Sequence, residues 1–207
     1  MRMKFKPWAR EELETSPFYI DNPCDYKGKW KTAFERQAPI YVELGCGKGN
    51  FIAQLSKKNQ DINFIAVDLV DAMLGMAKRN VEATYGIRNS TVAEEVEDEI
   101  EKQKVVKNLK LIRYDISRIS DIFDKQDSIS RIYINFCNPW PRGKHHKKRL
   151  THERQLEQYA KFLNGEIFFK IPVSPSTRYS NTTFSKIKTK WFQNFSTAGI
   201  CIFSSGE

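Results

Sequence analysis

The stretch that decides the fold of this chain is Ile40-Tyr41-Val42-Glu43-Leu44-Gly45-Cys46-Gly47-Lys48-Gly49. Its first five residues are mostly apolar, which predicts a short strand, and three alternating glycines end that strand abruptly. From Asn50 onward, Phe51, Ile52 and Leu55 share one helical face. The glycines therefore occupy a strand-to-helix turn, where the backbone can approach a ligand closely because no Cβ stands in the way.

Strands and helices continue to alternate beyond this turn. The run 62–68 is almost entirely apolar, as a strand buried on both faces should be, and a helix with Met73, Ala77 and Val81 on one face follows it. Later segments are expected as strands at 109–114, 131–136 and 166–170, a short helix at 116–123, and a helix capped by Thr151. This alternation predicts an α/β fold with a Rossmann-like, doubly wound and mostly parallel sheet.

Three segments differ in texture, and we expect them to be distinct units. Residues 1–38 are aromatic, basic and weakly periodic, which predicts an irregular N-terminal arm with a short helix near 10–14. Residues 39–170 carry the α/β pattern. Residues 171–207 contain Glu207 as their one acidic residue, and we expect this divergent tail to be poorly ordered.

A charged segment at 91–107 interrupts the α/β domain. Val92, Val96 and Ile100 recur at helical spacing within it, and its acidic block spans 94–101. Such a run is usually one solvated helix face, although the block could also repel nucleic acid or hold a partner.

Composition limits the kind of protein this is. With 40% hydrophobic and 29% charged residues, the 207-residue chain is expected to be globular and soluble. It contains no apolar run of about 18 residues and no signal peptide, so we expect a cytoplasmic protein without a membrane partner. The formal net charge of +9 suits a nucleic-acid partner, but it also suits a generally basic, soluble surface.

Cysteine and histidine positions exclude two further kinds of site. Cys24, Cys46, Cys137 and Cys201 form no C-x-x-C pair, which indicates reduced thiols rather than a disulfide framework. The three histidines at 145, 146 and 152 have no carboxylate or cysteine at ligand spacing. No metal site is predicted.

The glycine turn differs from a dinucleotide-binding loop. Its spacing is G-x-G-x-G, and the carboxylate of Glu43 precedes Gly45 and Gly47. A carboxylate repels a pyrophosphate but favours a ligand with a cationic end. S-adenosylmethionine, which has a sulfonium, an ammonium and no phosphate, suits this arrangement; a tight structural turn is the alternative.

Two aspartates support a ligand site at the same edge of the sheet. Asp68 ends the second predicted strand and Asp115 follows the third. Ligands of open α/β sheets lie beyond the carboxyl ends of the strands. There, Asp68 could bind two ribose hydroxyls, and Asp115 could accept a hydrogen bond from an adenine amino group.

The fourth predicted strand leads into a stiff loop and then a basic run. The loop is Asn135-Phe136-Cys137-Asn138-Pro139-Trp140-Pro141, where Trp140 could either stack on a base or pack in the core. The run 142–149 holds five fixed cations in eight residues. Because it adjoins the predicted cofactor edge, we interpret it as a contact for phosphate backbone rather than a merely solvated loop.

These motifs together resemble the bacterial tRNA (guanine-N7-)-methyltransferase family. The similarity covers about residues 4–170 and rests on Lys6-Pro7-Trp8-Ala9, Asn22-Pro23 with Tyr26-Lys27-Gly28-Lys29-Trp30, the glycine turn, and the loop and basic run 135–151. The resemblance implies an S-adenosylmethionine-dependent enzyme that methylates a guanine in the variable loop of tRNA. The oligomeric state stays open between monomer and homodimer.

The resemblance also assigns roles to residues. It implies a cofactor site lined by Glu43, Asp68, Asp115 and Asn138, with Gly45 and Gly47 in the turn, and it makes Asn138 the catalytic position. It implies substrate contact by Arg142. RNA contacts are implied for the basic run, namely Lys144, His145, His146, Lys147, Lys148 and Arg149.

This chain departs from the family pattern in three ways. The family usually has Asp at the position of Asn138 and Lys at that of Arg142. The acidic segment 91–107 resembles an insertion before the Asp115 strand, and Ile171-Pro172 stands where the family follows the Lys170 strand with Thr-Asp. Two alternative functions therefore remain. Asn-Pro-Trp is also similar to the loop of methyltransferases that act on exocyclic amines, and the divergent tail is compatible with a catalytically impaired RNA- or cofactor-binding relative.

Overall fold

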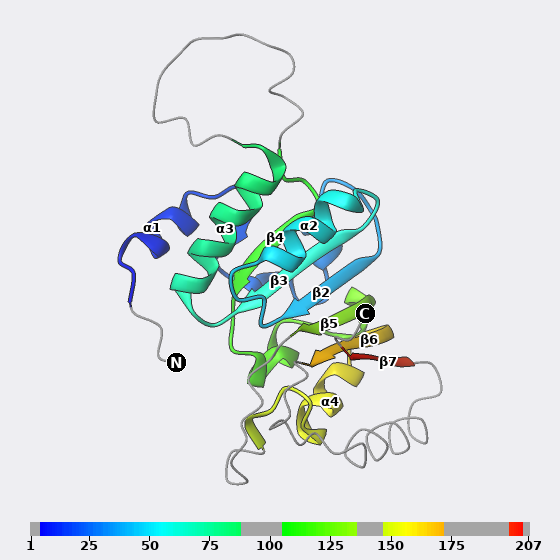
Figure 1. Cartoon of the computed structure of the whole chain (residues 1–207). Coiled ribbons are helices and arrows are strands. Elements are labelled where there is room, and N and C mark those ends of the chain that lie inside the picture. The colour runs from blue at the N-terminus through cyan, green and yellow to red at the C-terminus, as the bar shows by residue number, and fades with distance from the viewer. Residues whose placement is uncertain (1–4, 88–104, 136–146, 172–198, 205–207) are drawn as a thin grey trace, which may run out of the picture.

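The computed structural model of the chain describes residues 5–87, 105–135, 147–171 and 199–204. Its strands form one seven-stranded sheet in the order β1-β4-β3-β2-β5-β6-β7, in which every neighbouring pair is parallel (Figure 1). The strands are β1 (Tyr19–Ile20), β2 (Ile40–Leu44), β3 (Asn63–Asp68), β4 (Leu109–Arg113), β5 (Ile129–Asn135), β6 (Leu163–Ile171) and β7 (Gly199–Ser204). The predicted doubly wound parallel α/β fold is confirmed.

Helices cover both faces of this sheet. The α-helices are α1 (Trp8–Glu14), α2 (Asn50–Lys58), α3 (Asp71–Tyr85) and α4 (Glu153–Ala160), and the 3-10 helices are η1 (Pro23–Tyr26), η2 (Trp30–Ala33), η4 (Ile116–Asp121) and η5 (Lys125–Asp127). In Figure 1, α1, α2 and α3 lie over the β4–β3–β2 half, whereas α4 lies beside β5 and β6. The sheet thus lies between two helical layers.

The alternation of side chains along β3 shows why the run 62–68 is almost wholly apolar. Phe64 and Ala66 join the core under α2 and α3, whereas Ile65 and Val67 join the core on the opposite face with residues of η4 and α4. All four side chains have no solvent exposure. A strand buried on both faces cannot alternate polar with apolar residues.

The N-terminal segment packs into both cores. Its helix α1 confirms the short helix expected near 10–14, and β1 pairs with β4 at the edge of the sheet. Trp30 is fully buried, and its indole Nε1 donates a hydrogen bond to the carbonyl of Ile122 at 2.7 Å. The strand β1 was not predicted because two residues carry no periodicity. The unit boundary at residue 38 stays a prediction.

Helix α4 begins one residue later than the sequence indicated. His152, not Thr151, is its N-cap: the ring Nδ1 of His152 accepts a hydrogen bond from the backbone N–H of Arg154 at 3.1 Å. Thr151 is instead buried. The backbone of His152 is extended, which is the conformation an N-cap requires.

Strand β6 is longer than expected because Asn164-Gly165 is inside the strand rather than in a turn before it. The register between β5 and β6 shifts between Ile129 and Arg131. A Cβ on Gly165 would lie 1.9 Å from the carbonyl oxygen of Ser130. The glycine therefore permits the close backbone approach at this irregularity.

Two predicted regions lie largely or wholly outside the described residues. The segment 91–107 falls mostly within the undescribed range 88–104, and most of the tail 171–207 lies in the undescribed ranges 172–198 and 205–207. The tail nevertheless contributes β7, which no sequence pattern had indicated. Within the described residues, every helix is too short or too polar to cross a membrane.

Candidate active site

The glycine turn lies at the carboxyl edge of the sheet and is fixed to the neighbouring strand. The backbone N–H groups of Gly45 and Cys46 both donate to the carbonyl of Val67, at 2.8 and 3.0 Å. Gly45, Gly47 and Gly49 all have positive φ, a conformation that L side chains rarely adopt. The turn is therefore held in one shape by β3 before any ligand binds.

The second and third glycines have different environments. A Cβ on Gly49 would lie 2.7 Å from the Cβ of Ala77, so this glycine lets α2 and α3 pack closely. A Cβ on Gly47 would meet no described atom within 4 Å. The described residues thus leave the space beside Gly47 open, as a turn that approaches a ligand requires.

Glu43, at the end of β2, is buried with one oxygen unused. Only 2% of the residue is exposed, and its Oε1 accepts a hydrogen bond from Nδ2 of Asn135 at 3.0 Å. Its Oε2 has no hydrogen-bond partner among the described residues. Burial, together with the nearby charge of Asp68, raises the pKa of Glu43 to about 8, although the bond from Asn135 opposes this rise. A cation or hydrogen-bond donor would satisfy this oxygen.

Asp68, at the end of β3, ties the glycine turn to the next helix. Its Oδ2 accepts from the backbone N–H of Gly47 at 2.9 Å, and its Oδ1 accepts from that of Val70 at 3.0 Å. Each carboxylate oxygen has a second lone pair and can accept another hydrogen bond. The side chain is therefore rigidly oriented and still able to bind hydroxyl groups.

Asp115 follows β4 at the same edge of the sheet, as expected, and it also caps a helix. Its Oδ1 accepts from the backbone N–H of Ser117 at 2.8 Å, which caps η4. The residue is exposed. The cap fixes one carboxylate oxygen and leaves a second oxygen for the predicted contact with an adenine amino group.

Sequence reasoning missed two residues that complete this site. Asn135 ends β5, which pairs with β2, and it orients the Glu43 carboxylate. The Cδ1 of Leu150 would lie 3.8 Å from a Cβ on Gly45, which brings the end of the basic run next to the glycine turn. The rule that strand ends share an edge could have identified Asn135, whereas Leu150 carried no signal.

Several predicted site residues cannot be placed. Asn138, Arg142, Lys144, His145 and His146, and also Trp140 in the same loop, lie outside the described residues. Of the rest of the basic run, Lys147 and Lys148 are exposed and Arg149 is half-buried. Cys46 is buried in the glycine turn, and burial raises the pKa of its thiol.

Comparisons with known proteins identify the family of the chain. A family model described as "Putative methyltransferase" matches residues 37–195, which extends beyond the range 4–170 expected from the sequence. A tRNA (guanine-N(7)-)-methyltransferase of Clostridium botulinum (strain Alaska E43 / Type E3) is 53% identical over 172 residues, covering 82% of this chain and 72% of the relative. A Ruminiclostridium cellulolyticum protein of the same name is 45% identical, with 82% and 67% covered.

Two solved structures with partial backbone similarity are named as follows. An antibiotic-related methyltransferase has a TM-score of 0.47 at 13% identity, covering 91% of this chain and 75% of the other. The human methyltransferase 10 domain containing protein has a TM-score of 0.43 at 13% identity, with 92% and 72% covered. By the extent and identity of its sequence matches, the chain belongs to the tRNA (guanine-N(7)-)-methyltransferase family.

Proposed function

We propose that this protein transfers a methyl group from S-adenosylmethionine to N7 of a guanine in the variable loop of tRNA. The observation that carries the proposal is the buried Oε2 of Glu43, which has no partner among the described residues and lies at a glycine turn with open space. The turn occurs in a chain that is 53% identical to a protein named for this activity.

The residues present fit the proposed cofactor better than they fit a nucleotide phosphate. Glu43 and Asp68 interact electrostatically, because the charge of Asp68 raises the pKa of Glu43. Two carboxylates this close to the turn repel a phosphate and attract a cation. The Oε2 of Glu43 would accept a hydrogen bond from the ammonium group, Asp68 would bind the ribose hydroxyls, and Asp115 would contact the adenine.

The proposed reaction does not require the protein to remove a proton from the guanine. Bound S-adenosylmethionine supplies an electrophilic methyl group, and guanine N7 offers a lone pair that carries no proton. No general base is needed, so the chain contributes mainly by aligning the two reactants. Asn138 and Arg142 are proposed to contact the base, and an uncharged Asn138 is compatible with this role. We expect Asn138→Asp to leave turnover unchanged or to raise it, because a carboxylate would stabilise positive charge developing on the guanine.

The basic run is proposed to bind tRNA beside the cofactor. Support comes from Leu150, which approaches Gly45 and so brings Lys147–Arg149 close to the glycine turn. Lys and Arg contacts to phosphates position an RNA without reading its sequence. A cytoplasmic location is proposed because tRNA is the substrate, and the protein acts as a monomer or a homodimer.

Identifying the methylated atom tests the proposal. The purified protein is incubated with methyl-labelled S-adenosylmethionine and unmodified tRNA. The RNA is then digested to nucleosides, and the labelled nucleoside is identified. The expected product is N7-methylguanosine. Label on an exocyclic amine would favour the alternative methyltransferase class, and an unlabelled RNA with cofactor bound would identify an impaired relative.

A further inference from the structure

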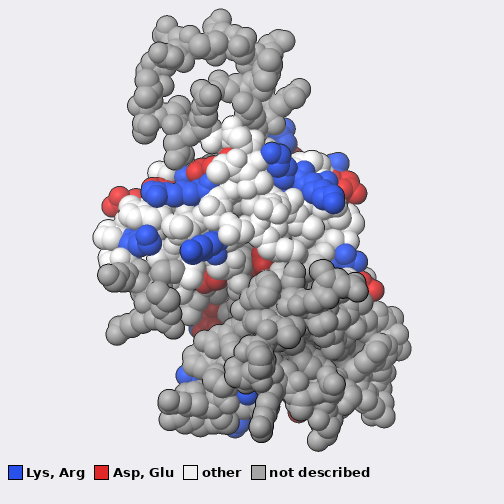
Figure 2. Space-filling model, viewed as in Figure 1, with Lys and Arg blue, Asp and Glu red and all other residues white. Residues whose placement is uncertain are grey.

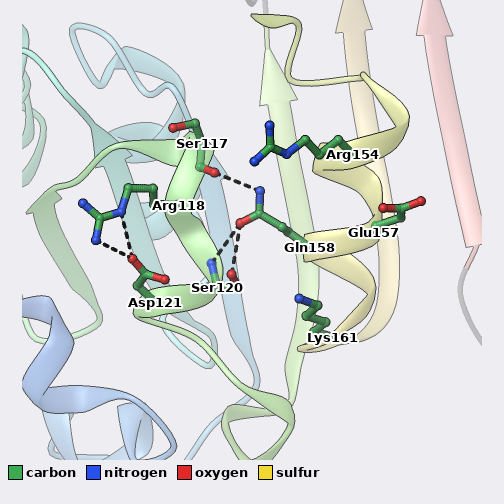
Figure 3. A pocket seen from close by; sticks show the side chains of 8 residues that line it. All are labelled: Ser117, Arg118, Ser120, Asp121, Arg154, Glu157, Gln158 and Lys161. Atoms are coloured by element: carbon green, nitrogen blue, oxygen red, sulfur yellow. Dashed lines mark hydrogen bonds and ion pairs between the residues drawn. The ribbon is translucent and has the colours of Figure 1, made fainter. Parts of the chain in front are cut away.

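A groove separates η4 from α4, on the face of the sheet opposite α2 and α3 (Figure 3). Its volume is about 360 Å³. It is lined by Ser117, Arg118, Ser120, Asp121, Arg154, Glu157, Gln158 and Lys161. None of these residues belongs to the cofactor site described above.

Gln158 holds the two walls of the groove together. Its Nε2 donates to the carbonyl of Ser117 at 2.9 Å, and its Oε1 accepts from Oγ of Ser120 at 3.1 Å (Figure 3). Both ends of this amide are thus used within the protein. The groove therefore has a fixed width and an uncharged middle, and its charged side chains decide what it can bind.

On the η4 wall, charge is already neutralised. Arg118 donates to Oδ2 of Asp121 from both Nε and a terminal nitrogen, each at 2.9 Å. The hydroxyl of Tyr114 donates to the same oxygen at 3.2 Å. The charge of Asp121 is therefore balanced by that of Arg118, and this wall adds little net charge.

On the α4 wall, two cations are unpaired. Arg154 and Lys161 are exposed, and their side chains have no hydrogen bond or ion pair with any described residue. In Figure 3 both extend toward the groove, with Gln158 between them, whereas Glu157 points away. Seven residues at helical rise separate the two by about 10 Å along the axis. The groove thus presents two separated positive charges.

On the other face of the molecule, several cations have acidic partners, although Lys58 of α2 has none among the described residues. Figure 2 shows Lys and Arg spread over the face that α1, α2 and α3 form, with Asp and Glu among them. Several are paired there: Arg79 with Glu12, Lys78 with Glu82, and Arg10 with Glu14. Unpaired positive charge beside a polar groove is thus a feature of the α4 side.

The groove also reaches the carboxyl edge of the sheet. Ser117, at one end, receives the cap from Asp115, and Arg154 lies five residues after the basic run ends at Arg149. The hydroxyl of Tyr159 in α4 donates to the carbonyl of Leu150 at 3.1 Å, which fixes α4 beside that run. A polyanion bound at the basic run could therefore continue along the groove.

We propose that this groove binds backbone phosphates of the tRNA, extending the RNA contact from the basic run down the η4–α4 face; this inference rests on the proposed function. A guanidinium and an ammonium both bind phosphate well, and hydroxyl groups such as that of Ser117 add neutral donors. The spacing of Arg154 and Lys161 suits successive phosphates of a strand better than one small anion.

The test compares two double variants that each remove two exposed cations. Arg154→Ala with Lys161→Ala removes the two unpaired cations of the groove. Lys58→Ala with Lys125→Ala is the matched control, because both lysines are exposed, have no partner among the described residues and lie near the amino ends of strands β3 and β5. The Kd for unmodified tRNA is measured over a range of salt concentrations, without methyl transfer.

The groove variant is expected to bind tRNA about tenfold more weakly near physiological salt. The slope of a plot of log Kd against the logarithm of the salt concentration should be smaller by about 2 than that of the wild-type protein. The control should change Kd less than twofold, and cofactor affinity should be unchanged in both. The charge-conserving pair Arg154→Lys with Lys161→Arg should retain most of the affinity. Equal weakening in groove and control variants would overturn the proposal, because it would show only an effect of total charge.

Three further outcomes are distinguishable. If inorganic phosphate binds the groove while tRNA affinity is unchanged in the Arg154/Lys161 variant, the groove is a small-anion site and the proposal fails. If the wild-type protein binds tRNA through the groove but yields no N7-methylguanosine, the proposed function fails while the groove assignment stands. A wild-type protein that binds no tRNA overturns both.

Discussion

The two halves of the sheet hold their helices in different ways. Over β4, β3 and β2 the helices touch at glycines: a Cβ on Gly49 would collide with Ala77 of α3, and one on Gly75 would lie 2.8 Å from Ala9 of α1. Beside β5 and β6, α4 meets η4 through the hydrogen bonds of Gln158, and a groove stays open between them.

This difference suggests that the two halves of the sheet bind different ligands, a division of labour between cofactor and tRNA. Close helix packing fixes the glycine turn, Glu43 and Asp68 in one arrangement, which suits a small ligand that must be held without adjustment. A polar, open seam with unpaired cations suits a large anion that binds mainly through its backbone. Substitutions in each half of the sheet should therefore have different effects.

The largest expected effect is on stability, at the contact between α2 and α3. Gly49→Ala combines positive φ with a Cβ 3.0 Å from the Cα of Ala77, so we expect the free energy of unfolding to fall by about 3 kcal/mol. Gly86→Ala is the control: its φ is also positive, but a Cβ there meets nothing within 4 Å, so the expected loss is about 1 kcal/mol. Urea denaturation measures both, and equal losses would contradict close packing as the cause.

The next effect concerns the unsatisfied oxygen of Glu43. Glu43→Gln keeps the side chain's size and its acceptor for Asn135, but it cannot ionise, whereas Glu43 can lose its proton when an ammonium group binds beside it. We expect the Kd for S-adenosylmethionine to rise about thirtyfold, or about 2 kcal/mol, since hydrogen bonds to charged groups contribute about that much. Calorimetry measures this, and tRNA affinity is the internal control. An unchanged cofactor Kd would remove Glu43 from the site.

The raised pKa of Glu43 also predicts a pH dependence of stability. In the unfolded chain this carboxyl ionises near 4.5, whereas burial raises its folded pKa to about 8. Between these values the folded protein keeps a proton that the unfolded chain has lost, so the contribution of Glu43 to stability falls as pH rises from about 4.5 to about 8. Urea titrations across this range should show a decline that is smaller in Glu43→Gln. Parallel curves for the two proteins would contradict the buried, protonated state.

A smaller effect is expected from the residue that orients Glu43. Asn135→Ala removes the hydrogen bond that lowers the pKa of Glu43, so that pKa should rise further. Cofactor affinity near pH 7 should fall about fivefold, or about 1 kcal/mol, and should recover as pH increases and Glu43 ionises. A loss of affinity that does not change with pH would show that Asn135 acts only by filling space.

The fold, and the gathering of the candidate site residues at one edge of the sheet, were predictable because local patterns encode them. A buried strand, an alternating glycine turn and an acid after the next strand specify Glu43, Gly47 and Asp68 without tertiary information. The cap at Thr151 was assigned wrongly because Thr151 and His152 both have cap-forming side chains, and only the burial of Thr151 decides between them.

Other features depend on contacts that no local pattern contains. The edge strand β1 is only two residues long, too short to show a periodicity. Asn164-Gly165 is typical of a turn in the sequence, and only the close carbonyl of Ser130 in the structure explains why a glycine lies inside a strand. The bond from Asn135 to Glu43 joins residues 92 positions apart. The groove depends on Gln158 reaching Ser117, 41 positions away, so sequence periodicity could not have revealed it.

Measuring both ligands on both halves tests the division of labour most directly. Equilibrium binding of S-adenosylmethionine and of unmodified tRNA is determined for Glu43→Gln and for the Arg154→Ala, Lys161→Ala variant. We expect Glu43→Gln to lose cofactor affinity and keep tRNA affinity, and the Arg154→Ala, Lys161→Ala variant to do the reverse. Equal weakening of both ligands in each variant would show that the two halves of the sheet are not separate binding units.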